Sequence, residues 1–324
     1  MLLPIRRLSY IVRTIIRIGS SPVAQTHIPS NSSRKDYFKG LVIATTGVVV
    51  LSFDALLIRL SGVSGFQASF WRALFTGISL ALVFFVSNRS RALAILRSGG
   101  KTMWISGIMW GFSGLCFTLG VQTAGAANTL VLISLAPLFA AAFGYIAYRQ
   151  RPSAVTQLAA LGAIGGIYFM YRNGFGDISF VGLVFAISTP ILLPTNLAYL
   201  RRHREMSRVA VCMIGGFVGA LISIVVTTGH VAISTQALVP LAVLGLFAIP
   251  FSQTMISTGT RYIPAAESAL INSLETVLGI VYVWLFLGEA PTGEFIVGAT
   301  IVMISITANS LYQARARKAG QSLH

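Results

Sequence analysis

Ten stretches of apolar residues follow one another along the chain, separated mostly by short polar segments. They cover roughly residues 40–60, 66–86, 103–122, 126–147, 155–172, 178–199, 209–228, 237–258, 264–287 and 293–313. About 20 apolar residues in a helix cross the hydrocarbon core of a bilayer, and backbone groups in that core must be paired within helices or a closed barrel. The runs are continuous and show no period of two, so they predict helices. We expect an all-α integral membrane protein with ten transmembrane helices.

Composition agrees with a lipid-embedded chain. Of the 324 residues, 55% are hydrophobic and only 10% are charged, against about 25% charged in soluble domains. The net charge of +16 raises nucleic-acid binding as an alternative, but the basic residues lie at the ends of the apolar runs rather than on one folded face. We therefore expect the lipid bilayer, and not a nucleic acid, as the partner of this charge.

The basic residues also predict an orientation. Twenty of the 24 fall in tails and loops assigned to one side, while Arg172 and Arg261 are assigned to the other and Arg59 and Arg72 fall within spans. Lys and Arg accumulate on the cytoplasmic side, which predicts a multi-pass protein of the cell membrane with both termini in the cytoplasm. Residues 1–38 form a basic N-terminal tail and 314–324 a basic C-terminal tail. The Arg-rich N-terminal tail also resembles a transit peptide, so the inner membrane of an organelle is the alternative.

The second half of the chain repeats the first. Sliding the fourth span against the ninth superimposes identical residues without a gap: Ala126, Ala127, Ser134, Leu135 and Pro152 meet Ala265, Ala266, Ser273, Leu274 and Pro291. Each half, residues 39–173 and 174–313, then holds five spans. Because five is odd, the halves enter the membrane in opposite senses, which is the inverted repeat used for alternating access.

These features resemble the drug/metabolite transporter superfamily, specifically its EamA-type ten-helix group. The resemblance rests on the two-repeat plan, on Phe70-Trp71-Arg72, on Pro137 and on the sequence from Leu285 to Glu289. Gln150, where an acid is usual, and Thr276, where proline is frequent, depart from the family pattern. The resemblance implies secondary-active export or exchange of a small polar metabolite, of the amino acid, amine or nucleotide-derivative type.

Two other classes remain as alternatives, a channel or facilitator for a small solute and a membrane-embedded enzyme. The short loops offer no pore lining, and no catalytic motif, metal-ligand spacing or cofactor motif is present. We expect no enzyme activity, no metal and no cofactor. A proton or an exchanged solute is the expected coupling partner, and the choice between monomer and homodimer stays open.

Asp54 and Arg72 predict an ion pair within the membrane. Each lies about six residues, or roughly 9 Å, from the same boundary of adjacent antiparallel spans, and unpaired charges at this depth are costly. The pair is predicted to gate a central cavity or to hold a substrate carboxylate on Arg72, and the alternative is a purely structural pair that fixes the helix register.

Glu275 lies near mid-membrane in the ninth span, on one face with Asn272. A carboxylic acid in a low-dielectric interior keeps its proton more readily than in water. We expect Glu275 to carry a proton or bind a cationic amine, the alternative being a hydrogen bond to a neighbouring helix. Two other acids are candidates for gating or structural charges: Glu267 near the outer end, beside Arg261, and Glu289 on the cytoplasmic side, facing Arg149 or Arg151.

Prolines accompany polar side chains in three spans. Proline removes a helix hydrogen bond and kinks the helix, and such breaks in membranes face protein or a cavity. A polar mid-membrane cavity is predicted, with ordinary helix bending as the alternative. The kink candidates are Pro137, Pro190, Pro194 and Pro250, and the polar candidates beside them are Asn128, Ser134, Asn196 and Gln253.

Overall fold

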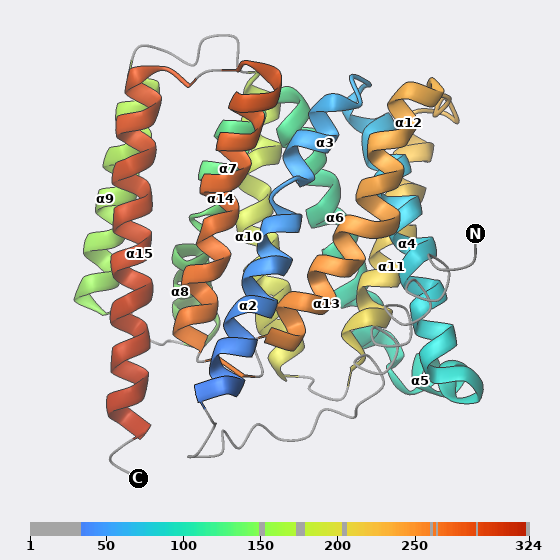
Figure 1. Cartoon of the computed structure of the whole chain (residues 1–324), viewed down its shortest axis with the longest axis horizontal. Helices are drawn as coiled ribbons and strands as arrows, with labels where there is room; N and C mark the ends of the chain where they lie inside the picture. The colour runs from blue at the N-terminus through green and yellow to red at the C-terminus, as the bar shows by residue number, and fades with distance from the viewer. Residues whose placement is uncertain are drawn as a thin grey trace.

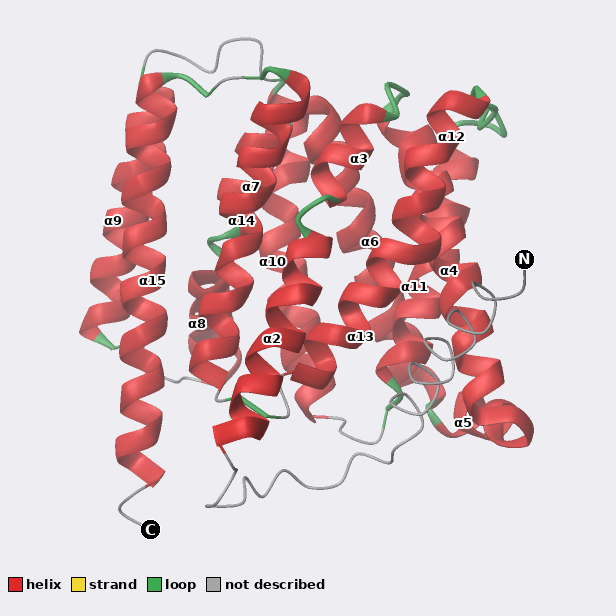
Figure 2. Ribbon diagram, in the orientation of Figure 1, coloured by secondary structure: helices red, strands yellow, loops and turns green. Residues whose placement is uncertain are grey.

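The described part of the chain forms helices and contains no strand (Figures 1 and 2). The structure is a computed structural model that describes residues 34–148, 153–172, 179–202, 206–259, 262–263, 265–289 and 291–321. Its elements are α2 (Arg34–Leu51), α3 (Asp54–Leu60), α4 (Gly65–Asn88), η1 (Arg89–Arg91), α5 (Ala92–Ser98), α6 (Gly100–Thr123), α7 (Ala126–Ile133), α8 (Ala136–Tyr148), α9 (Ala154–Tyr171), α10 (Phe180–Arg202), α11 (Arg208–Val226), α12 (Thr235–Ala242), η2 (Val243–Ala248), α13 (Ile249–Gly259), α14 (Ala265–Leu287) and α15 (Gly293–Gln321).

Ten membrane-crossing segments result. Eight helical segments are long and apolar enough to cross a membrane, and α10 and α14 add the shorter apolar stretches Phe180–Asn196 and Ile271–Leu287. Three of the ten are interrupted along their length: α2 continues into α3, α7 into α8, and α12 through η2 into α13. The prediction of an all-α membrane protein with ten transmembrane helices is confirmed.

The two ends of the bundle carry different elements. We call them the α3 end, where α3, α12 and the α14–α15 connection lie, and the α5 end, where α2 begins and α15 ends (Figure 1). The α13–α14 connection lies at the α5 end, since the Lys39 ammonium near the start of α2 stands 5.8 Å from the ring centroid of Tyr262. The assignment of this connection, and with it Glu267, to the opposite side was wrong, because the eighth of ten alternating spans ends where the first begins.

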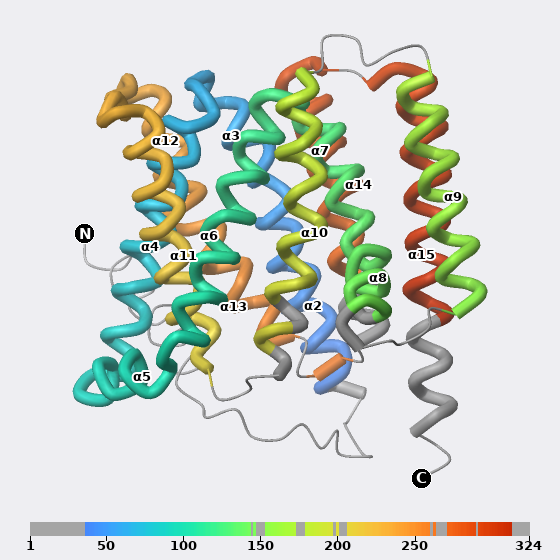
Figure 3. The backbone as a smooth tube through the Cα atoms, turned by 180° about the vertical axis from the view of Figure 1, so that it is seen from behind, coloured from blue at the N-terminus to red at the C-terminus, as the bar shows by residue number. Residues whose placement is uncertain are grey.

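The two repeats pack against each other through equivalent helices. Helix α4 packs on α11, its counterpart, and α9 on α15, while the α2–α13 and α10–α6 contacts form an equivalent pair; α9 beside α15 and α6 beside α10 are visible from behind in Figure 3. At the α4–α11 crossing, a Cβ on Gly216 would lie 2.7 Å from the Cα of Gly77. The sequence offset between these glycines is the same as that between Ala126 and Ala265. Equivalent residues of the two repeats therefore contact each other across the interface. Only residues without a side chain allow this backbone contact.

Contacts between unlike helices are duplicated as well. A Cβ on Gly259 would lie 2.7 Å from the backbone nitrogen of Ala44, and one on Gly120 would lie 3.1 Å from that of Ala186. The sequence offset from Gly120 to Gly259 is the same as that from Gly77 to Gly216, whereas the offset from Ala44 to Ala186 is slightly larger. The first span therefore matches the sixth with a larger offset than the one that relates the other spans. The duplicated contacts are those of an inverted repeat of five helices.

We expect Gly166→Ala to lower stability by about 1–3 kcal/mol, the usual cost of overpacking. A Cβ there would lie 2.7 Å from the carbonyl oxygen of Gly298 and 2.8 Å from Val302, in the α9–α15 contact. Gly165 is the matched control, because a Cβ at that position meets nothing within 4 Å. Thermal unfolding in detergent checks the pair; equal melting temperatures for the two alanine variants would contradict the close packing.

The proline positions fall at different kinds of helix irregularity. Pro137 is the second residue of α8, directly after the break at Ser134 and Leu135, whereas its counterpart Thr276 lies within the unbroken α14. Helix α10 runs through Pro190 and Pro194 as one helix.

Pro250 follows the π-helical turn η2. Because proline lacks an N–H, it leaves the carbonyl of Leu246 without its usual helix partner. The Ser79 hydroxyl of α4 donates to this carbonyl at 2.9 Å. The irregularity at Pro250 is therefore satisfied by a neighbouring helix, as broken membrane helices require.

Candidate functional site

A break in the first span provides the first charged group of the site. Helix α2 ends at Leu51, the Ser52 hydroxyl bonds back to the carbonyl of Val48 at 2.8 Å, and α3 starts at Asp54. Asp54 is 5% exposed and lies in the first turn of α3, where a negative charge is favoured by the helix dipole. The interruption thus places a carboxylate inside the bundle.

Arg72 of α4 pairs with this carboxylate through two hydrogen bonds. Its Nε donates to Asp54 Oδ1 at 3.1 Å and its Nη2 to Oδ2 at 2.6 Å, and the arginine is 9% exposed. The guanidinium carbon also lies 5.5 Å from the ring centroid of Phe117 on α6. The ion pair expected from the equal depth of the two residues is present, with two-point geometry that fixes α3 to α4.

Glu275 of α14 joins the same site. It shares a helix face with Gly279 and Tyr282, and that face meets the α2–α3 break: a Cβ on Gly279 would lie 3.5 Å from the carbonyl oxygen of Ser52, and the rings of Phe53 and Tyr282 stack with centroids 4.3 Å apart. The partly buried Glu275 interacts electrostatically with both Asp54 and Arg72. The site therefore combines two acids with one base, and Glu275 has no ion-pair partner among the described residues.

A second ion pair holds the other end of α3. Arg59 Nη2 donates to Glu289 Oε1 just beyond α14, and the Gln122 side chain of α6 donates to the carbonyl of Ile58 at 3.0 Å. The expectation that Glu289 faces Arg149 or Arg151 is wrong. Glu289 follows an odd-numbered span and so lies at the α3 end; Arg149 and Arg151 lie outside the described residues.

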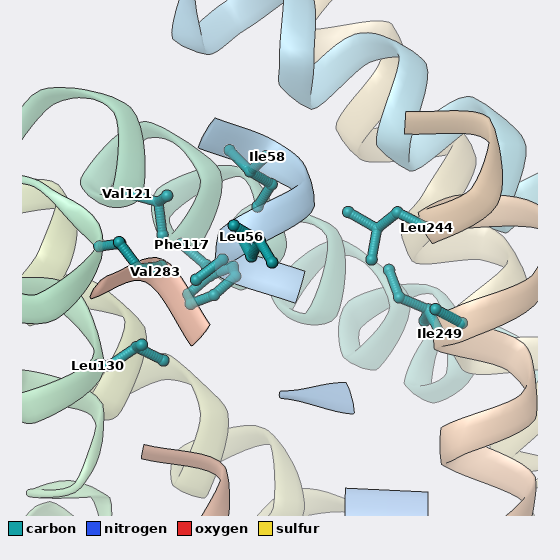
Figure 4. Close-up of a cluster of buried hydrophobic side chains, with 11 residues drawn as sticks. Leu56, Ile58, Phe117, Val121, Leu130, Leu244, Ile249 and Val283 are labelled. Carbon is teal, nitrogen blue, oxygen red and sulfur yellow. The ribbon is translucent and has the colours of Figure 1, made fainter. Parts of the chain in front are cut away.

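Apolar side chains of α3 close the space between these two ion pairs. Leu56 and Ile58 are at most 2% exposed and pack with Phe117, Leu244 and Ile249, as Figure 4 shows. Within a membrane such side chains hold neighbouring helices together through close van der Waals packing. Helix α3 therefore forms a buried cover over Asp54, Arg72 and Glu275 from the α3 end.

The other polar candidates lie away from these three charges or carry different contacts. Asn128 accepts a hydrogen bond from Tyr171 at 2.9 Å, and Ser134 bonds to the carbonyl of Val131 within its own turn. Asn196 is 1% exposed and accepts from the Ser106 hydroxyl at 2.5 Å. Gln253 and Asn272 are exposed. The side chain of Glu267 lies outside the described part.

Several contacts of the site escape prediction from sequence. Trp71, next to Arg72, donates to the carbonyl of Val231 at 2.8 Å and so holds the α11–α12 connection against α4. The stacked rings of Phe53 and Tyr282 come from segments far apart in the chain. The repeat gives a signal for a further residue, because Asn196 follows Asp54 by the same offset that relates the first and sixth spans.

An inverted repeat of five membrane helices around a buried cluster of charges defines a membrane transport protein. The model of the EamA-like transporter family matches residues 25–172 and again residues 173–311. The chain belongs to the EamA-like transporter family and is a transmembrane transporter of small solutes.

Two further proteins are similar to this chain. An uncharacterized transporter of Bacillus subtilis (strain 168), YdfC, is 20% identical over 264 residues, which cover 79% of this chain and 85% of that protein. A protein of known crystal structure shares the fold with a TM-score of 0.60 and 18% identity, over 86% of this chain and 97% of the other.

Proposed function

We propose that this protein is a secondary-active carrier that moves a small polar metabolite by alternating access and exchanges it for a proton at Glu275. One observation carries the proposal: Glu275 adds a second acid to the buried Asp54–Arg72 pair. When Glu275 is protonated, the three groups sum to zero charge; when it is ionised, they carry one negative charge in a low-dielectric interior. A proton or the ammonium group of a substrate removes that charge, so the two compete for one position.

The inverted repeat supports the mechanism of movement. Glu275 belongs to the second repeat, whereas Asp54 and Arg72 belong to the first. A relative movement of the two repeats would change the residues around Glu275. It would also change the side of the membrane from which protons and substrate have access to Glu275.

Proton flux into liposomes tests the coupling. A thermal-shift screen of amino acids and amines would first select compounds that raise the melting temperature of the purified protein. The protein would then be reconstituted into liposomes that enclose a pH-sensitive dye. We expect an outward gradient of a selected compound to drive protons inward, with a rate that saturates. Substrate uptake without any proton movement would overturn the exchange, and a rate that rises linearly without saturation would favour a channel.

We also propose that the α5 end faces the cytoplasm. Arg89, Arg91, Arg97 and Lys101 gather there, around α5, and basic residues favour that side. Epitope tags on the two termini should both be protected from protease in intact cells and be cleaved after permeabilisation. A tag that is cleaved in intact cells would contradict this orientation.

A further inference from the structure

Helix α3 of the first repeat has a counterpart in the last part of α10 in the second repeat. We call these two segments the gate segments. The offset that relates Ala44 to Ala186 maps α3 (Asp54–Leu60) onto residues 196–202, the last turns of α10. The two segments lie at opposite ends of the bundle: α3 defines one end, and the last turns of α10 lie towards the other, the α5 end (Figure 1). Each repeat thus supplies one segment to one end of the bundle.

The charges of the two gate segments differ. The counterpart of Asp54 is Asn196, and the counterpart of Arg72, in the frame that relates Gly77 to Gly216, is Val211. Where α3 has a buried ion pair, α10 therefore has a neutral hydrogen bond from Ser106 to Asn196. The break that separates α2 from α3 is also absent from α10, which is one helix through Pro194.

The Arg59–Glu289 pair has no equivalent in the other repeat, because the acidic residue is replaced there. In the sequence, Arg201 stands at the position equivalent to Arg59, but the position equivalent to Glu289 is Gln150. Ion pairs thus join α3 to α4 and to α14, whereas the equivalent positions of the second segment cannot form either pair.

Exposure along α14 agrees with closure at one end only. Thr276, Gly279 and Val283 follow one buried stripe of the helix towards the α3 end. Asn272 continues that stripe by one turn towards the α5 end, yet it is exposed. One turn below Thr276, α14 is thus uncovered on the side of Asn272, while the neighbouring Ile271 packs with Ala44 and Val48 of α2.

We propose that the two ion pairs of α3 lock the α3 end of the carrier, so that the substrate-free protein rests closed at this end and open at the α5 end. The inference rests on the alternating-access carrier proposed above, with Glu275 reached from the α5 end in this resting state. In the proposed orientation, the resting carrier accepts its substrate from the cytoplasm. Loss of the Arg59–Glu289 pair frees α3 to open without disturbing the three charges of the transport site.

Cysteine labelling in sealed vesicles tests the inequality of the two gates. In a background with Cys116 and Cys212 replaced by alanine, Ala126→Cys reports on the buried α3 end and Asn272→Cys on the α5 end, with a membrane-impermeant maleimide applied from each side. Before any gate variant is introduced, Asn272→Cys should react quickly from one side and Ala126→Cys slowly from the other.

Removal of either partner of the second ion pair should then open the α3 end. E289Q and R59Q should each raise the labelling rate of Ala126→Cys by about fivefold, the size expected for loss of a partly exposed ion pair. The double variant should resemble either single variant, because one interaction is lost in all three. E294Q, which removes an acid of α15 at the same end, is the control and should leave the rate unchanged.

The outcomes separate this inference from the proposals on which it rests. Unchanged labelling in E289Q and R59Q, or faster labelling of Ala126→Cys than of Asn272→Cys in their absence, would overturn the lock. Fast labelling of Asn272→Cys from the outside would reverse the orientation but support the unequal gates. The labelling needs no substrate, so a failure of proton coupling at Glu275 is detected only in the liposome assay.

Discussion

Glu275→Gln should reduce proton-coupled transport to the level of protein-free liposomes while the protein still folds. Glutamine keeps the shape of the side chain but cannot carry a proton in exchange for substrate. Glu275 is only partly buried, so we expect α14 to accept this neutral amide, and the Asp54–Arg72 pair stays balanced without Glu275. The loss should therefore appear as uncoupling rather than as unfolding.

Two measurements on the same preparation establish this. The melting temperature and the substrate-induced thermal shift report the fold and binding, while dye quenching in liposomes reports proton movement. Glu294→Gln, at the start of α15, is the matched control and should transport normally. If Glu275→Gln transports with the pH dependence of the unaltered protein, Glu275 is not the proton carrier.

Arg72→Met should destabilise the protein by about 3–5 kcal/mol, because it leaves the Asp54 carboxylate buried without a partner. Both side chains of this pair are at most 10% exposed, so water cannot replace the lost charge. The double variant D54N/R72M removes both charges and should recover much of the loss. Thermal unfolding in detergent, followed for the single variants and the double variant, measures the coupling between the two residues.

The Arg59–Glu289 pair gives an internal comparison for this prediction. Its side chains are 30% and 40% exposed, and an ion pair of that exposure contributes about 0–1 kcal/mol. Arg59→Met should therefore change the melting temperature far less than Arg72→Met. Equal losses in the two variants would show that burial does not set the cost of breaking these pairs.

Hydrophobic length and charge depth carried most of the fold prediction. The ten spans followed from the distance across a bilayer, and the Asp54–Arg72 pair followed from equal depth on adjacent helices. Both inferences need only the depth of a residue within its own span, which follows from counting residues along the sequence. The repeat was visible in the ninth span because the helices there align without a gap.

The rest of the site depended on how distant helices turn towards each other. Glu275 and Tyr282 reach the Asp54–Arg72 pair and Phe53 from a helix of the other repeat, and no spacing reveals this. The partner of Arg59 was missed for a simpler reason: Glu289 was assigned to the wrong end of its span. The match of the first span to the sixth was hidden because its offset is larger than that of the other spans.

The meeting of Gly77 with Gly216 has a geometric consequence. Since the two are the same position of the repeat, any exchange of shape between the halves maps this point onto itself. In the alternating-access carrier proposed above, we therefore expect the crossing of α4 and α11 to act as a fixed pivot, at which the backbone contact between Gly77 and Gly216 is kept while the two ends of the bundle open in turn.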